Sequence, residues 1–258
     1  MSSPARKLGK LPVKHDARTL FLSEVLIKPQ LPAPEPFDYL KGLPDDLGMM
    51  GNDVAGNCTC AGIAHLVQVM TFVVTGTAFV ATTDQVIDLY KAITKEVNGR
   101  EYDPNDPDTD TGLALLDVLK YVRNNGFCGH AKGMAFAKLH HNDQAQVEIG
   151  GRLFGGTYTG AQLPIDAQSQ LDADQPWTPT DGAGGEPGGW GGHCMTAARA
   201  DETLGYITWG KRRAALWPWV AKYADEMYVG ISPDWINGNA KAPSGFDLAA
   251  LRQYLSAL

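Results

Sequence analysis

The stretch Gly51-Asn-Asp-Val-Ala-Gly-Asn-Cys58-Thr-Cys60-Ala-Gly-Ile-Ala-His-Leu-Val-Gln-Val-Met70 is the most informative part of this chain. A glycine-containing loop leads to Cys58, and an apolar run with helical spacing follows, which predicts a helix over residues 59–74. The unpaired N–H groups and the positive dipole end at a helix start favour a thiolate over a thiol. We therefore expect Cys58 to have a lowered pKa and to act as a nucleophile.

A second motif lies far downstream, in Gly188-Gly-Trp-Gly-Gly-His193-Cys-Met-Thr-Ala-Ala198. It places His193 at the head of an apolar run typical of a strand, and Tyr206-Ile-Thr-Trp-Gly210 follows it. This order of a cysteine, then a histidine, then a Trp-Gly strand resembles that of papain-like cysteine peptidases. The resemblance is closest to bacterial and phage-encoded members of the family.

The nucleophile motif of those members reads roughly as Gln, a short linker, Gly-Ser-Cys-Thr and an alanine-rich helix. In this chain Asn52 takes the glutamine position, and Gly-Asn-Cys-Thr at 56–59 takes the core position. Gly192-His193 matches the Gly-His-Ala-Val strand of the family, and residues 207–210 lie over its Asn-Ser-Trp-Gly. The motifs span roughly residues 45–235 in the expected order.

The resemblance implies a thiol hydrolase that cleaves a peptide or related amide bond. Cys58 would be the nucleophile, and His193 would accept its proton and later protonate the leaving amine. The backbone N–H of Cys58 and the side-chain amide of Asn52 would form the oxyanion hole. Trp209 would shield the hydrogen bond of the histidine, and Trp190 would line a substrate subsite.

The sequence departs from the family at Ile207, which lies at the position of the histidine-orienting asparagine and cannot accept a hydrogen bond. Three groups could replace it: the Thr208 hydroxyl, the Asp225 or Glu226 carboxylate, or a backbone carbonyl. A cysteine–histidine dyad can work without a strong third member. The alternative is a catalytically degenerate protein of the same fold, such as a phage structural or accessory subunit that only binds a partner.

Composition limits the other function classes. The 258 residues are 44% hydrophobic, enough for one substantial core, and the net charge of −7 gives no footprint for nucleic acid or anionic lipid. The N-terminus has no apolar signal-peptide region, and no window approaches the ~20 apolar residues of a membrane span. We expect a soluble protein that is cytoplasmic, or virion-associated if phage-encoded. Its expected partners are a peptide or protein substrate and, as a second kind of partner, a protein of an assembly.

A zinc site would compete for the same thiols and imidazole. The candidate ligands are Cys58, Cys60, His193 and Cys194. One-residue spacing on a helix start and adjacent positions on a strand point these side chains in different directions, unlike structural zinc ligands. We therefore expect no metal and no cofactor.

The chain divides into three parts. Residues 1–45 are rich in proline and predict an extended arm that wraps around the body. Residues 46–240 form the papain-like domain, and residues 241–258 an amphipathic C-terminal helix. Helices come first and antiparallel strands later, which indicates an α+β fold. The family resemblance implies two lobes, a helical one with Cys58 and a sheet lobe with His193.

Local signals place further elements inside that domain. A capping box at residues 82–85 opens a second helix, and Gly126 ends a third. We expect helices at 59–74, from 83, at 112–124, just after 142 and at 217–223. We expect strands at 157–163, 194–199, 204–209 and 227–231, and a long loop at 166–192.

Overall fold

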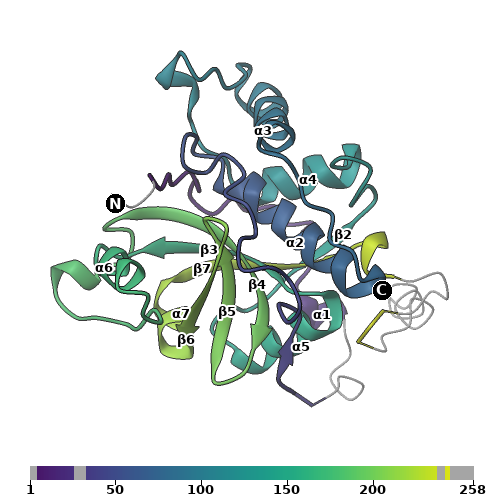
Figure 1. Ribbon diagram of the computed structural model, residues 1–258, viewed down its shortest axis with the longest axis vertical. Coiled ribbons are helices and arrows are strands. Elements are labelled where there is room, and N and C mark those ends of the chain that lie inside the picture. Colours follow the sequence, from purple (N-terminus) through teal and green to yellow (C-terminus); the bar gives the residue numbers. More distant parts are fainter. Residues whose placement is uncertain (1–4, 26–32, 237–241, 245–258) are drawn as a thin grey trace.

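The computed structural model describes residues 5–25, 33–236 and 242–244 (Figure 1). Helices and one antiparallel sheet make up this part, so the predicted mixture of elements is confirmed. The helix expected over 241–258 lies almost wholly outside the described residues. The helices are α1 (Leu22–Val25), α2 (Cys58–Thr75), α3 (Thr83–Asn98), α4 (Leu115–Asn125), α5 (Gln144–Phe154), α6 (Asp166–Asp172) and α7 (Trp217–Tyr223). Short 3-10 helices are η2 (Pro107–Thr109), η3 (Ala183–Gly185) and η4 (Pro233–Trp235).

Two of the predicted helix ends follow their sequence signals. Thr82 accepts a hydrogen bond from the backbone of Gln85 while the Gln85 side chain accepts one from the backbone of Thr82, which makes the predicted capping box. Gly126 ends α4 with a φ of 79°. The predicted start of α4 at residue 112 is wrong, because Ala114 is extended and the helix begins at Leu115.

The sheet has the strand order β2-β7-β3-β4-β5-β6, with β1 paired to β4, and all pairs are antiparallel. Its strands are β1 (Phe37–Asp38), β2 (Ala135–Lys138), β3 (Thr157–Leu163), β4 (Gly191–Ala200), β5 (Thr203–Thr208), β6 (Lys211–Leu216) and β7 (Ala224–Ile231). Strands β1, β2 and β6 were not predicted from the sequence. The long loop predicted at 166–192 is also wrong in part, since α6, η3 and the first residues of β4 lie there.

Helix α2 is the central helix of the molecule. It packs against β4, with α3 and α4 on its other side (Figure 1). Among the described residues, it is the one helix that is long and apolar enough to cross a membrane, so the expectation that no window approaches a membrane span is wrong for this stretch. However, 78% of that stretch is buried inside the structure. Its apolar character is therefore that of a core helix, whose side chains pack on both the helical and the sheet side.

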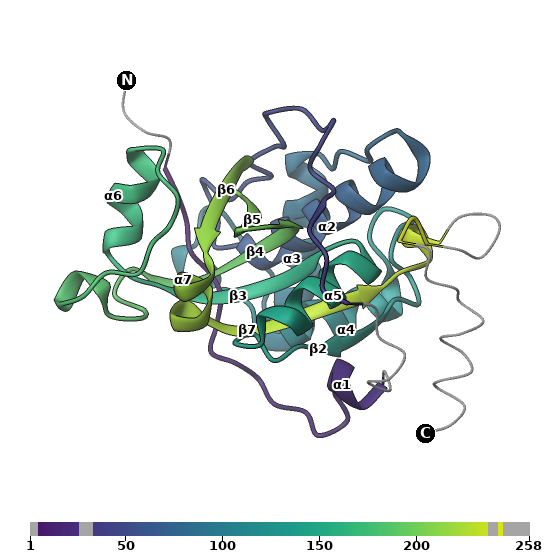
Figure 2. The same cartoon turned by 90° about the horizontal axis from the view of Figure 1, so that it is seen from below.

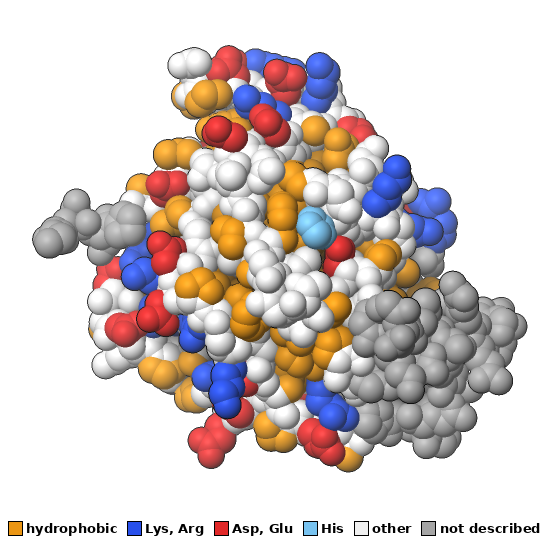
Figure 3. Space-filling model, turned by 45° about the vertical axis from the view of Figure 1, so that its right-hand side comes forward, with side chains coloured by type: hydrophobic (Ala, Val, Ile, Leu, Met, Phe, Trp, Pro, Cys, Tyr) orange, Lys and Arg blue, Asp and Glu red, His pale blue; other side chains and the backbone are white. Residues whose placement is uncertain are grey.

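The surface carries both signs of charge. On the face shown in Figure 3, acidic and basic side chains are interspersed around a centre of apolar and uncharged groups. No continuous basic area forms among the described residues on that face.

Candidate active site

Cys58 is the first residue of α2, and the loop before it is held by hydrogen bonds to side chains. The Asn57 amide donates to the carbonyl of Met50 over 2.9 Å, and Tyr158 on β3 donates to the carbonyl of Thr59 over 2.8 Å. These bonds tie the helix start to the preceding turn and to the sheet. The thiol of Cys58 is thereby fixed where α2 meets β4, with only 1% of the residue exposed.

His193 lies on β4, and its ring is held on an edge and on a face. Nε2 lies 2.7 Å from the hydroxyl oxygen of Thr208 on β5. The indole of Trp209 stacks on the ring, with centroids 4.1 Å apart and planes 13° from parallel. Among the described residues, Nδ1 has no hydrogen-bond partner. The imidazole therefore has a fixed orientation and one free nitrogen.

The alternation of side chains along β5 explains why Thr208, and not Ile207, contacts His193. Ile207 faces the opposite side and is buried against Leu47 and Val69. Thr208, one residue later, faces the histidine. Of the alternatives left open by the sequence, the carboxylates of Asp225 and Glu226 bind other groups, described below, so the hydroxyl of Thr208 is the group next to Nε2.

Asn52 and Trp190, two of the predicted site residues, contact groups that the sequence did not indicate. The Asn52 amide donates to the carbonyl of Ala55 over 3.2 Å, so in this arrangement it is engaged within its own turn. Trp190 stacks on Trp209 with centroids 5.3 Å apart, which places it beside the aromatic cover of His193. The structure thus brings Trp190, Trp209, Thr208 and His193 together.

The N-terminal arm does more than wrap the body, because part of it lies over Cys58, with Asn52 and Leu113 on one side and Gly192 on the other. The space that it fills there is called the cleft below. Figure 2 shows this purple segment running from beside α6, along the sheet, to α1. Residues 7–11, here called the arm segment, form backbone bonds on both sides, as a bound peptide would. These bonds are Lys7 N to Asn52 O (2.9 Å), Leu113 N to Gly9 O (2.8 Å), Leu11 N to Leu113 O (3.0 Å) and Lys10 N to Gly192 O (3.2 Å).

Glycines allow the arm segment to approach this closely. A Cβ on Gly9 would lie 1.7 Å from the carbonyl oxygen of Gly56, and one on Gly192 would lie 2.3 Å from that of Lys10. No side chain fits at either distance. The sequence predicted an extended arm but not its path, because a glycine between two lysine-containing dipeptides carries no signal of what it will contact.

Burial favours the neutral forms of both predicted catalytic residues, Cys58 and His193. It raises the pKa of the Cys58 thiol to about 11, although backbone groups of Cys194 and Gly9 and the charge of Lys10 act in the opposite direction. Burial also lowers the pKa of His193 to about 3. The predicted lowered pKa of Cys58 is therefore wrong for this arrangement, because the cost of burying a charge exceeds the stabilisation at the helix start.

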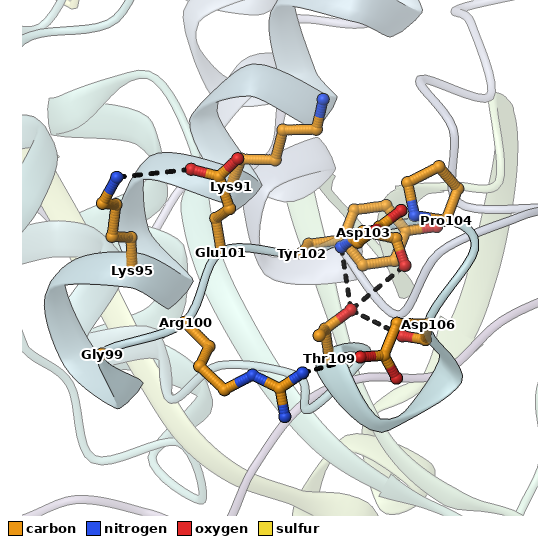
Figure 4. Close-up of a pocket in the computed structure, with 10 residues that line it drawn as sticks. All are labelled: Lys91, Lys95, Gly99, Arg100, Glu101, Tyr102, Asp103, Pro104, Asp106 and Thr109. Atoms are coloured by element: carbon orange, nitrogen blue, oxygen red, sulfur yellow. Dashed lines mark hydrogen bonds and ion pairs between the residues drawn. The ribbon is translucent and has the colours of Figure 1, made fainter.

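Hollows formed by the described residues also lie away from Cys58 and His193. One of about 550 Å³ lies beyond the end of α3 and includes Tyr102 among its lining residues (Figure 4). Its charged groups pair with each other, Lys95 with Glu101 at 3.5 Å and Arg100 with Asp106 at 2.6 Å. Within the described residues, no three His, Cys, Asp or Glu side chains are grouped so that they could hold a metal ion, and all four cysteines are free.

One comparison with known proteins bears on the fold. No protein-family model and no curated protein matches the sequence. Among solved structures, the chain is similar to procathepsin B S9 from Trypanosoma congolense, with a TM-score of 0.54 and 9% sequence identity. The match covers 88% of this chain and 86% of that one. This similarity shows that the chain has a cathepsin B-like fold, as the sequence resemblance implied.

Proposed function

We propose that this protein is a papain-like thiol hydrolase that cleaves a peptide or related amide bond between a helical lobe with Cys58 and a sheet lobe with His193. One observation carries the proposal. His193 is fixed through Nε2 by Thr208 and keeps a free Nδ1, and the next residue on its strand, Cys194, contacts the Cys58 thiol through its backbone. The cathepsin B-like fold supports the same assignment.

The fixed ring assigns a role to each nitrogen. With the proton on Nε2 and donated to Thr208, Nδ1 is a lone-pair acceptor for the thiol proton. The thiolate of Cys58 then attacks the substrate carbonyl, and the protonated ring returns its proton to the leaving amine. Water hydrolyses the resulting thioester. Trp209 excludes water from the hydrogen bond between His193 and Thr208.

The developing oxyanion requires hydrogen-bond donors. We assign them as the backbone N–H of Cys58 and the Asn52 amide, which must first leave the carbonyl of Ala55. The arm segment must also leave, because it occupies the space of a substrate. Its departure would expose Cys58 and His193 to water and remove the main cause of their shifted pKa values. The arrangement described is thus a latent form of the hydrolase.

A second candidate is a protein that keeps the fold only to bind a partner, for example as a phage structural or accessory subunit. The observation that favours it is the neutral, buried dyad under a well-bonded arm segment. In that case the cleft would serve to anchor the arm.

The Gly9→Val chain separates the two candidates, since its added side chain cannot fit beside Gly56 and should displace the arm segment. In a hydrolase, this chain cleaves members of a peptide library, and adding Cys58→Ala or His193→Ala abolishes cleavage while circular dichroism shows an unchanged fold. If cleavage survives either alanine substitution, the dyad is wrong. If the displaced chain shows a reactive Cys58 and no cleavage, the binding function is supported.

A further inference from the structure

Lys10 has a fixed place relative to the proposed nucleophile. It follows Gly9, whose backbone contacts the Cys58 thiol, and its own N–H donates to the carbonyl of Gly192, just before His193. The backbone bonds on either side of it, between the arm segment and Leu113, set its register. The side chain of Lys10 therefore enters the sheet side of the cleft, next to the residue of the arm that contacts Cys58.

That side chain is wholly buried and ends between two carboxylates. Its ammonium nitrogen lies 2.8 Å from Oδ2 of Asp225 and 3.3 Å from Oε1 of Glu226, and it donates to the carbonyl of Leu11 over 3.1 Å. The stem passes over Gly160, where a Cβ would lie 2.2 Å from Cε of the lysine. The space that Lys10 fills thus has the length of one basic side chain and ends at two acidic groups.

A β-bulge brings the two carboxylates together. Gly160 of β3 is paired with Glu226, whereas the next residue, Ala161, is paired with Ala224. Asp225 is therefore an extra residue on β7. Adjacent residues on a regular strand point to opposite faces, but here Asp225 and Glu226 both reach the same ammonium.

Protein groups also hold the carboxylates without the lysine. The Gln162 amide donates to Asp225 over 2.8 Å, and the Tyr228 hydroxyl donates to Glu226 over 3.0 Å. A buried ion pair is a poor source of stability compared with apolar packing. Two oriented carboxylates facing a removable segment are explained better by recognition of a cation than by stability.

We propose that Asp225 and Glu226 form a specificity pocket for the side chain of lysine or arginine in an extended peptide lying across Cys58, with Lys10 as its intramolecular occupant. The inference rests on the proposed function in taking the cleft as the substrate site. Recognition of a basic side chain can be measured by binding alone, so it stands or falls independently of peptide cleavage.

The experiment uses the full chain carrying Cys58→Ala, Gly9→Val and Lys10→Glu. The alanine prevents cleavage, the valine clashes with Gly56, and the glutamate is repelled by the pocket. A fluorescent peptide with the sequence of residues 6–13 is titrated in an anisotropy assay, beside the same peptide with norleucine in place of the fifth residue. Displacement of the arm is checked by alkylation of Cys58 in the matched chain that retains this cysteine.

We expect the lysine peptide to bind at least about tenfold more tightly than the norleucine peptide. Adding Asp225→Asn and Glu226→Gln should reduce this preference to less than about twofold, whereas Glu202→Gln, at an exposed carboxylate outside the cleft, should leave it unchanged. Equal binding of the two peptides would overturn the proposal. Binding of neither peptide, in a chain whose matched Cys58 version is readily alkylated, would do the same. If alkylation shows that the arm stays in place, the Lys10→Ala test below decides.

If the triple variant does not fold, Lys10→Ala provides a second test, because it leaves an empty pocket and only shortens one side chain. Propylammonium has the length of the missing atoms and the same charge. At tens of millimolar it should raise the melting temperature of Lys10→Ala by about 2 °C or more, but not that of the wild-type chain. The same shift with 1-propanol, or none with either compound, would contradict a cation-selective pocket.

Discussion

Gly9→Val should increase the alkylation rate of Cys58 by at least ~20-fold at pH 8. In the arrangement described, the pKa of about 11 leaves about one thiol in a thousand ionised at this pH. If displacement of the arm returns the pKa to the ordinary value of about 8.5, roughly one thiol in four is ionised. The ~200-fold gain in thiolate is offset about tenfold because a less basic thiolate is a weaker nucleophile. Better access of the reagent adds to the remaining factor.

The assay is a time course of iodoacetamide labelling, quenched and mapped by peptide mass spectrometry. Cys128 is the internal control, since it is exposed and should label equally in both chains. In the wild type Cys128 should be modified first, and Cys58, Cys60 and Cys194 should be slow because they are buried. The reasoning is refuted if Cys58 reacts as fast as Cys128 in the wild type, or if Gly9→Val leaves its rate unchanged.

Four other substitutions test His193 and its surroundings. Thr208→Val removes the partner of Nε2 and should lower turnover of the Gly9→Val chain by roughly ten- to a hundredfold, with Thr208→Asn retaining more activity; equal turnover of all three chains would exclude the orienting role. Ile207→Asn places an amide in the core beside Leu47 and Val69, so urea unfolding should show a loss of about 1–3 kcal/mol, and turnover should not rise. A rise would mean that Thr208 does not orient the ring. Because the folded-state pKa of His193 is lowered to about 3, its contribution to stability is present above its ordinary pKa near 6.5 and is lost as the pH falls towards 3. Between pH 6.5 and 4, wild type should therefore lose up to about 3 kcal/mol more stability than His193→Gln, and equal losses would contradict a buried neutral ring.

The sequence predicted the elements whose signals are local. The capping box at Thr82, the apolar run after Cys58 and the strand expected at 157–163 lie within one element each, and the structure contains all three. Strand β6 was missed because its Lys-Arg-Arg start has no apolar alternation and it gains its place by pairing with β5.

The candidate site was predictable only in part, for a similar reason. Motif order pointed to Cys58 and His193, and the polarity of Thr208 made it one of several possible partners of the histidine. The choice among those partners depends on which side chains of β5 point towards His193. The proposed pocket at Asp225 depends on a bulge in β7 against β3. The raised pKa of Cys58 comes from its burial in the folded chain, where its neighbours include Gly9, about 50 residues away in sequence. None of these long-range contacts leaves a local pattern.

The measurement that tests the central claim most directly is the initial rate at which the Gly9→Val chain hydrolyses a coumarin amide of a lysine-containing peptide, with thiols kept reduced. We predict hydrolysis that is lost in Gly9→Val/Cys58→Ala and in Gly9→Val/His193→Ala, and that is much slower in the wild type because its arm segment fills the cleft. A Gly9→Val chain whose Cys58 is readily alkylated, but which hydrolyses the amide no faster than its Cys58→Ala counterpart, would contradict the assignment as a thiol hydrolase.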